Sequence, residues 1–190
     1  MKIAPPIIKI PDVLQLPKVN PDIFKKLLEL LSERKLTKKL SEEQAKKSGR
    51  YIAWFRKNFP AHRADVFGAV KLRVFQGGGT ALSGASVSKA KIYEELKRIG
   101  DIIVPFKYSS ILVNNNTICG KHRDSNNVGR SLLISIGDYE GCKIVIEGKE
   151  YDAKYTPTIF NGSEKEHWNT DDLVGNKYSL VYYFIENDAI

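Results

Sequence analysis

The sequence has few of the features that mark secreted or membrane proteins. It holds only two cysteines, Cys119 and Cys142, among 190 residues, which argues against a disulfide-stapled fold and favours a reducing, intracellular compartment. No apolar run reaches the ~20 residues that a transmembrane helix needs, so we expect no membrane span. Pro5 and Pro6 stand where an export signal would carry its apolar region, so we expect no such signal.

Charge is distributed unevenly along the chain. Residues 1–100 hold 21 Lys+Arg and 9 Asp+Glu, a net charge of +12, whereas residues 101–190 hold 9 and 13, a net charge of −4. A solvated surface explains any single basic cluster, but the asymmetry gives one region a field that attracts a polyanion. We expect one domain of 190 residues that acts as a monomer, with a polyanion as its partner.

The first part of the chain carries helical patterns behind a proline-rich arm. Residues 1–20 are expected to be extended, and residues 21–105 form a basic helical region with one strand and a Gly-rich loop. Asn20 is a suitable N-cap and Pro21 suits the first helical position. The stripe Phe24, Leu27, Leu28 and Leu31 then predicts an amphipathic helix.

Two further helices and a strand are predicted in this region. A capping box at Ser41 and Gln44 opens a helix that runs towards Pro60, and a third helix extends from about Ser88 to Gly100. Between them, residues 66–75 have the β-rich texture of a strand. Lysines and arginines of the first two helices, with Trp54 and Phe55 near them, are candidates for contacting the phosphates of such a polyanion.

Residues 106–190 change to short β segments. Strands are predicted at residues 111–113, 131–136, 143–147, 158–160 and 178–185, with turns at 114–116, 137–138, 147–148 and 161–162. Regular short strands of this kind favour a sandwich or jelly roll. The fold class expected is therefore α+β, a double-stranded β-helix (jelly-roll) core with an N-terminal helical layer.

Two of the three histidines stand in this β half with a metal-binding pattern. His122 and Asp124 form a His-x-Asp pair, which on a strand points both side chains to one face. With His167 they would make the two-imidazole, one-carboxylate facial triad of non-haem Fe(II) enzymes, which leaves positions open for a cosubstrate and O2. Alone, a His-x-Asp pair is more often a solvated cluster.

A lysine ten residues after His167 adds to this pattern. Lys177 opens an apolar strand, and a cation inside a sandwich needs a partner that offsets its desolvation. The distal carboxylate of 2-oxoglutarate would be such a partner, and Ser179 on the same face would donate a second hydrogen bond. The alternative is a lysine that protects a strand edge from aggregation.

In these blocks the sequence resembles the Fe(II)/2-oxoglutarate dioxygenases, and among them the TET/JBP-like DNA base oxygenases. The resemblance runs from about Phe67 to Phe184 and is densest in the segments 114–116, 122–131, 137–141 and 160–181. It implies that Fe(II) is held by His122, Asp124 and His167, with 2-oxoglutarate and O2 as cosubstrates. It also implies that Lys177, with help from Ser179, binds the 2-oxoglutarate C5 carboxylate.

The resemblance assigns one more residue and meets two differences. An Asn three residues after the metal Asp helps hold the flipped base in this branch, which places that role on Asn127. A turn residue is the equally simple interpretation of Asn127. Arg73, on the predicted strand, is a further candidate contact for cosubstrate or substrate. The family usually has Arg where this chain has Lys177, and a second Gly where it has Cys142.

The function implied is oxidation of the 5-methyl group of a pyrimidine in double-stranded DNA, with the methylated base flipped out of the stack. 5-Methylcytosine converted to 5-hydroxymethylcytosine and beyond is the first candidate, and thymine hydroxylation is the second. A prolyl or lysyl protein hydroxylase needs the same metal site, so it remains an alternative. A non-catalytic nucleic-acid-binding module, with His122 and His167 structural, is a further hypothesis.

Overall fold

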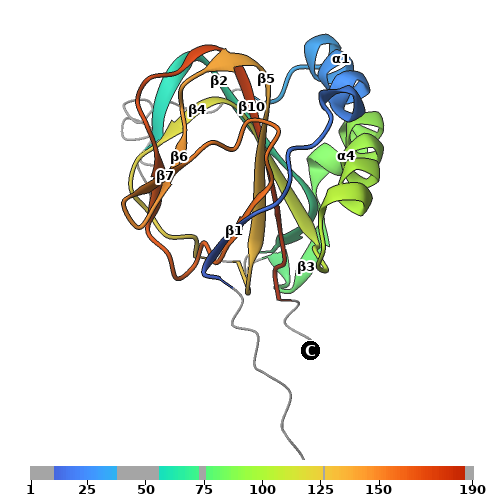
Figure 1. Ribbon diagram of the computed structural model, residues 1–190. Coiled ribbons are helices and arrows are strands. Elements are labelled where there is room, and N and C mark those ends of the chain that lie inside the picture. The colour runs from blue at the N-terminus through green and yellow to red at the C-terminus, as the bar shows by residue number, and fades with distance from the viewer. Residues whose placement is uncertain (1–10, 38–55, 73–75, 126, 187–190) are drawn as a thin grey trace, which may run out of the picture.

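The computed structural model describes residues 11–37, 56–72, 76–125 and 127–186, with residues 56–62 as backbone only. It contains two β-sheets and a layer of helices on one side (Figure 1). The larger sheet has seven strands in the order β1-β8-β5-β10-β4-β2-β3, and the smaller has three in the order β7-β6-β9. All pairings within both sheets are antiparallel.

The strands span a wide range of lengths. Four of them have ten residues or more and form the centre of the large sheet, because β10 pairs with both β5 and β4, and β4 pairs with β2. The strands are β1 (Val13–Gln15), β2 (Arg56–Lys71), β3 (Thr80–Leu82), β4 (Ser110–Cys119), β5 (Ser131–Glu140), β6 (Ile144–Ile146), β7 (Lys149–Tyr151), β8 (Thr158–Phe160), β9 (His167–Asn169) and β10 (Val174–Tyr183).

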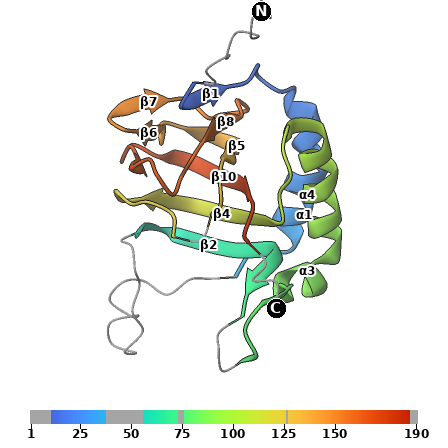
Figure 2. The same ribbon diagram turned by 90° about the horizontal axis from the view of Figure 1, so that it is seen from below.

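The helices cover one face of the large sheet. Among the described residues they are the 3-10 helix η1 (Pro21–Phe24), α1 (Lys25–Glu33), α3 (Gly84–Ser88) and α4 (Ala90–Ile103). Figure 2 shows α1, α3 and α4 together on one side of the strands. Leu27 of α1 and Leu96 of α4 join Leu180 and Tyr182 of β10 in one buried cluster. The Tyr182 hydroxyl donates a hydrogen bond to the Leu96 carbonyl at 2.9 Å, which ties the helix to the sheet.

The small sheet lies on the opposite face. Its residues Ile144 and Ile146 pack in a second cluster with Leu133 of β5 and Phe160 of β8. The core is therefore split between the two faces of the large sheet, with the helices on one side and the small sheet on the other. This arrangement confirms the predicted α+β fold with a jelly-roll core and a helical layer.

The structure confirms the first predicted helix and corrects the ends of the others. Asn20 accepts a hydrogen bond from the Asp22 amide at 3.0 Å, as an N-cap does. The prediction of a helix running towards Pro60 is wrong at its end, because residues 56–60 belong to β2; residues 41–55 lie outside the described part of the chain. Gly100 lies inside α4 and does not end it.

Packing explains the glycine inside α4. A Cβ at Gly100 would lie 2.3 Å from the Tyr108 hydroxyl oxygen and 2.8 Å from Tyr182 Cε1. Those two rings meet edge to face with centroids 5.1 Å apart. The glycine therefore lets the helix approach a tyrosine pair rather than marking a helix end.

Two predicted turns lie inside strands. Residues 114–116 are buried in β4, where the Asn115 and Asn116 amides each donate a hydrogen bond to Asn176 Oδ1. Gly137 lies inside β5 with φ of 114°, and a Cβ there would lie 2.4 Å from the Asn176 carbonyl oxygen on β10. Asparagine and glycine serve here for contacts between strands, whereas the sequence pattern suggested chain reversals.

The seven-stranded sheet draws on all parts of the described chain. β1 comes from the segment expected to be an extended arm, and it pairs with β8. β2 comes from the region expected to be mainly helical, and it pairs with β4. No helix among the described residues is long and apolar enough to cross a membrane.

Candidate metal centre

The structure brings His122, Asp124 and His167 together from two segments. His122 follows β4 and forms an antiparallel bridge with His167 of β9, with hydrogen bonds of 3.1 and 3.0 Å between their backbones. The Asp124 amide donates to the Gly162 carbonyl at 2.8 Å. The expectation that His122 and Asp124 share a regular strand is therefore wrong, because backbone bonds to the 162–167 segment place the two side chains.

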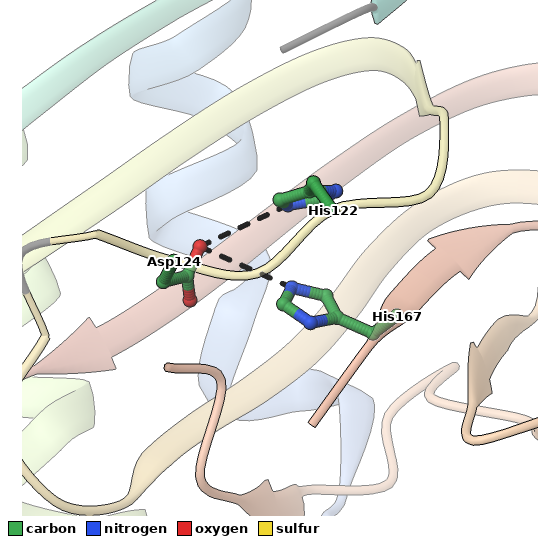
Figure 3. A group of neighbouring side chains, drawn as sticks. All are labelled: His122, Asp124 and His167. Atoms are coloured by element: carbon green, nitrogen blue, oxygen red, sulfur yellow. Dashed lines mark ion pairs between the residues drawn. The ribbon is translucent and has the colours of Figure 1, made fainter. Parts of the chain in front are cut away.

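The three side chains converge on one point (Figure 3). Asp124 Oδ1 lies 3.8 Å from His122 Nε2 and 3.9 Å from His167 Nε2. One ligand atom from each residue lies within 4.8 Å of the others. Nitrogen and oxygen ligands bind a first-row divalent ion at about 2.0–2.2 Å, so a small inward movement of these side chains closes the site around an ion.

The backbone fixes which nitrogen of each imidazole faces the site. His122 Nδ1 lies 2.7 Å from the Gly120 carbonyl oxygen and His167 Nδ1 lies 2.9 Å from the Lys165 carbonyl oxygen. A carbonyl only accepts, so each Nδ1 donates its proton, and in the neutral imidazole Nε2 then keeps its lone pair. The ring of Phe160 packs edge-on against His167, with centroids 5.0 Å apart, and holds its plane.

The donor set fits Fe(II). Two neutral imidazoles and one carboxylate on one side of an ion make the facial arrangement used by non-haem iron oxygenases. The side chain of His167 is 7% exposed and that of Asp124 is 28% exposed, so the site is shielded on the protein side and open on the other. These residues can hold a divalent ion and leave its outer positions accessible.

Lys177 lies on the same face of the large sheet as the metal centre. Tyr178, Leu180 and Tyr182 pack in the cluster that includes the helices, so Lys177 and Ser179 point to the opposite face. That face also bears Phe160, which touches His167. The predicted cosubstrate lysine and the predicted metal ligands thus share one side of the jelly roll.

The Lys177 ammonium is buried among neutral partners. The residue is 2% exposed, and Nζ donates to the Cys142 carbonyl oxygen and contacts Cys142 Sγ, both at 3.1 Å. No carboxylate of the described residues forms an ion pair with it. A buried cation with neutral partners is poorly compensated, which is the state expected of a group that receives an anionic ligand.

A row of polar side chains crosses three strands beside Lys177. Ser179 of β10 faces Ser135 of β5 and Asn114 of β4 in the strand register, and the two serine hydroxyls lie 3.4 Å apart. Burial raises the pKa of Tyr139 well above its ordinary value, against a hydrogen bond with Ser135 that lowers it. Its phenol is protonated at physiological pH, as any ordinary tyrosine is, and Lys177 Nζ lies 5.7 Å from the ring centre.

Tyr183 lies further along the same strand face, near the metal centre. Its pKa is raised to about 12, first by burial and then by the nearby negative charge of Asp124, while a hydrogen bond with Ser110 lowers it. The phenol is neutral at physiological pH, as an unperturbed tyrosine also is. This neutral hydroxyl keeps the surroundings of Asp124 free of a second negative charge.

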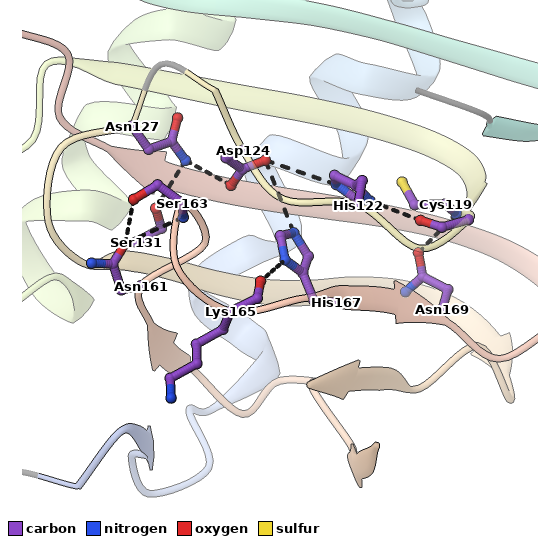
Figure 4. A network of polar contacts seen from close by, with 11 residues as sticks. Cys119, His122, Asp124, Asn127, Ser131, Asn161, Ser163, Lys165, His167 and Asn169 are labelled. Atoms are coloured by element: carbon purple, nitrogen blue, oxygen red, sulfur yellow. Dashed lines mark hydrogen bonds and ion pairs between the residues drawn. The ribbon is translucent and has the colours of Figure 1, made fainter. Parts of the chain in front are cut away.

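Two predicted site residues remain, Asn127 and Arg73, and of these the structure places Asn127 beside the metal centre. Asn127 Nδ2 donates to Asp124 Oδ2 at 2.8 Å and to Ser131 Oγ at 3.1 Å (Figure 4). Arg73 lies outside the described residues.

Three residues of the site were not predicted from the sequence. Ser135, Gly137 and Tyr139 are spaced two residues apart on β5, so the spacing alone predicts that they share one face of the strand. Their closeness to Lys177, however, depends on the register between β5 and β10. The sequence predicts Gly162 as a turn residue and places it in a segment that carries the family resemblance, but it assigns Gly162 no role in the site. Nothing in its sequence context signals that it packs against Asp124.

Comparisons with known proteins support the fold. No protein-family model matches the sequence, and no curated protein matches it. The structure is similar to NgTET1 in complex with 5mC DNA, with a TM-score of 0.53, 15% sequence identity, and 92% of this chain and 72% of that chain covered. It is also similar to a C-terminally truncated thymine hydroxylase of Neurospora crassa in apo form, with a TM-score of 0.50, 13% identity, and coverage of 92% and 83%.

A third similar structure is a prolyl-4-hydroxylase of Pseudomonas putida. The TM-score is 0.50, the sequence identity is 10%, and 93% of each chain is covered. At these identities the likeness establishes the fold. The chain has the jelly-roll fold of the 2-oxoglutarate/Fe(II) oxygenases, and on that fold it carries a His-Asp-His cluster suited to iron.

Proposed function

We propose that this protein is an Fe(II)/2-oxoglutarate-dependent dioxygenase that oxidises the 5-methyl group of a pyrimidine base in DNA, with 5-methylcytosine as the first substrate. One observation carries the dioxygenase part of the proposal. Three metal-binding side chains lie within 4.8 Å of one another on the same sheet face as a buried lysine that has no carboxylate partner among the described residues. A metal and a dicarboxylate are the two ligands that this pair of features accommodates.

The metal-binding residues have separate tasks. His122 and His167 would present Nε2 to Fe(II), since their Nδ1 protons are held by backbone carbonyls. Asp124 would present Oδ1 and neutralise part of the ion's charge. Iron, 2-oxoglutarate and O2 together would supply the oxidation of the methyl C–H bond, and the protein would supply position and exclusion of water.

Lys177 and its neighbours would bind the cosubstrate. The ammonium would pair with the distal carboxylate of 2-oxoglutarate, and the Ser179 hydroxyl would donate to the same group. The Tyr139 phenol, which is protonated at physiological pH as any ordinary tyrosine is, is a further donor close to Lys177. Because the ammonium is already stripped of water, a carboxylate that reaches it gains a strong charge-assisted interaction.

Two observations support DNA as the substrate. NgTET1, a structural neighbour, was solved with 5mC DNA. The first hundred residues carry the net charge of +12, and the loop that holds the metal ligands exposes two cations of its own, Lys121 and Arg123. Lys121 is 62% exposed and forms an ion pair of 3.8 Å with the half-exposed Glu166, which phosphates would compete with. Cations beside the metal centre would attract the phosphates that flank a flipped base.

A prolyl hydroxylase is the second candidate, favoured by the similarity to the Pseudomonas putida enzyme over 93% of both chains. A substrate panel separates the two candidates. The protein is incubated with Fe(II), ascorbate and 2-oxoglutarate, and with duplex DNA containing 5-methylcytosine, the same duplex with cytosine, or a proline-containing acidic peptide. Mass spectrometry of nucleosides and peptides is expected to show oxidised product with the methylated duplex.

Other results would refute the proposal. Hydroxylated peptide together with unchanged methylated DNA would identify a protein hydroxylase. Oxidation of thymine in both duplexes, without 5-hydroxymethylcytosine, would assign the enzyme to thymine instead. DNA binding that does not weaken as salt increases would contradict the phosphate contacts.

A further inference from the structure

The two oxygens of the Asp124 carboxylate have different surroundings. Oδ1 faces the two imidazoles, at 3.8 Å from His122 Nε2 and 3.9 Å from His167 Nε2. Oδ2 accepts a hydrogen bond of 2.8 Å from Asn127 Nδ2. The carboxylate is therefore already oriented with one oxygen towards the metal centre and the other held by an amide (Figure 4).

The backbone of Gly162 packs against the same carboxylate oxygen, Asp124 Oδ2. A Cβ at Gly162 would lie 2.3 Å from Asp124 Oδ2 and 3.2 Å from Asp124 Cγ. The Gly162 carbonyl accepts a hydrogen bond of 2.8 Å from the Asp124 amide. The backbone of Gly162 therefore contacts both the main chain and the carboxylate of Asp124. Gly162 has no positive φ, which means that close approach, and not backbone conformation, requires a glycine here.

The donor capacity of Asn127 is fully used in the protein. Its Nδ2 group has two protons, and these go to Asp124 Oδ2 and to Ser131 Oγ at 3.1 Å. The Ser131 side chain lies at the start of β5, in a residue that is 1% exposed. Asn127 thereby links the carboxylate to a fixed strand of the large sheet, which restricts rotation of the carboxylate.

We propose that Asn127 and Gly162 are positioning residues that keep Asp124 bound to the metal through Oδ1 alone. This inference rests on the proposed iron site. A carboxylate that bound through both oxygens would occupy one coordination position more. Three protein ligands on a six-coordinate ion leave three positions for cosubstrates only if each residue binds through a single atom. Outer partners that orient a ligand typically change metal affinity about 10- to 100-fold when they are lost.

The test measures metal binding without cosubstrate or DNA. Mn(II), which reports its binding by electron paramagnetic resonance, is titrated into the wild-type protein and into the variants Asn127→Ala, Asn127→Ser and Gly162→Ala. We expect the dissociation constant to rise about 10- to 100-fold in each variant. The matched controls are Asn161→Ser, which keeps a turn acceptor for Ser163, and Gly84→Ala, where a Cβ would meet nothing within 4 Å.

The outcomes distinguish this inference from the proposed function. Unchanged Mn(II) affinity in the Asn127 variants, with loss only of DNA oxidation, would overturn the positioning role and assign Asn127 to the flipped base. Unchanged affinity in Gly162→Ala would likewise overturn the role of the close approach. Thermal unfolding without metal identifies any variant that fails to fold, and the serine variant then replaces the alanine one. A wild-type protein that binds Mn(II) and oxidises no DNA refutes the proposed function alone.

Discussion

Replacing the buried Lys177 with methionine tests two properties of this lysine: the free energy that its burial costs the folded protein, and its contribution to binding 2-oxoglutarate. Methionine has nearly the same length and no charge, so the variant removes the ammonium without opening a large cavity. Lys177 is 2% exposed and its polar contacts are the oxygen and sulfur of Cys142, both at 3.1 Å. Desolvation of an ion costs several kcal/mol, whereas a hydrogen bond from a charged group returns about 1.5–3 kcal/mol.

These magnitudes predict opposite effects on stability and on binding. Without cosubstrate, Lys177→Met is expected to unfold at a higher denaturant midpoint, with a gain of about 1 kcal/mol in the free energy of unfolding. Loss of one charge-assisted interaction with the distal carboxylate is expected to weaken 2-oxoglutarate binding by roughly 10- to 150-fold. Isothermal titration calorimetry in the presence of Mn(II) measures the second effect.

The exposed Lys149 provides the control for this experiment. Its ammonium lies 5.3 Å from the Tyr151 ring centre on the small sheet, so Lys149→Met is expected to change neither quantity by a measurable amount. A Lys177→Met variant that binds 2-oxoglutarate as tightly as the wild type would refute the assignment of this lysine. A variant that is less stable than the wild type would show that the ammonium is well compensated in the protein, which would contradict the expected desolvation cost.

Further predictions concern the metal ligand, the helix packing and alkaline stability. Asp124→Ala removes the one charged ligand and is expected to abolish Mn(II) binding in a titration while the far-ultraviolet circular dichroism stays unchanged. Gly100→Ala is expected to lower the free energy of unfolding by about 1–2 kcal/mol, because the steric conflict with Tyr108 and Tyr182 exceeds the gain in helix propensity; an unchanged denaturation midpoint would contradict this. The folded-state pKa of Tyr183 is raised to about 12, so its contribution to stability is fully present below pH ~10 and is lost as pH rises through about 12, by roughly 2–3 kcal/mol. Tyrosinate absorbance combined with denaturation at increasing pH checks this window, and stability that stays constant from pH ~9 to ~12 would contradict it.

The sequence predicts structure best where a residue type acts through local geometry or has a specific ligand chemistry. An Asn-Pro pair before an apolar stripe located η1 and α1, because capping and the fixed φ of proline act locally. His122, Asp124 and His167 were assembled into one site from spacing and family resemblance, although the loop that holds two of them is not a strand. Their convergence depends on the bridge between His122 and His167.

The sequence misled where asparagine and glycine act across strands. Both residue types favour turns in isolation, yet Asn115 and Asn116 bind the neighbouring Asn176, and Gly137 admits the carbonyl of that same residue. These contacts exist only once β4, β5 and β10 are paired. No local pattern encodes the register that creates them, so their burial could not be read from the chain alone.

The site has a similar division between local and tertiary information. The sequence and the resemblance identified Asn127 as a residue of interest, but its hydrogen bond to Asp124 Oδ2 became visible only in three dimensions. The turn pattern and the resemblance both include Gly162, but neither predicts its contact with the Asp124 carboxylate, because the two residues lie 38 positions apart in the sequence. Ligand types can be predicted from a sequence, whereas the contacts that orient those ligands need the fold.

Product analysis of a single reaction decides whether this metal centre oxidises a base in DNA. Purified protein is incubated with Fe(II), ascorbate, 2-oxoglutarate and DNA containing 5-methylcytosine, and oxidised nucleosides and succinate are quantified in the same reaction, beside the Asp124→Ala variant. We predict 5-hydroxymethylcytosine and succinate in the wild-type reaction and neither in the variant. The absence of both products from a wild-type protein that binds metal, or equal product from Asp124→Ala, would contradict the proposed function.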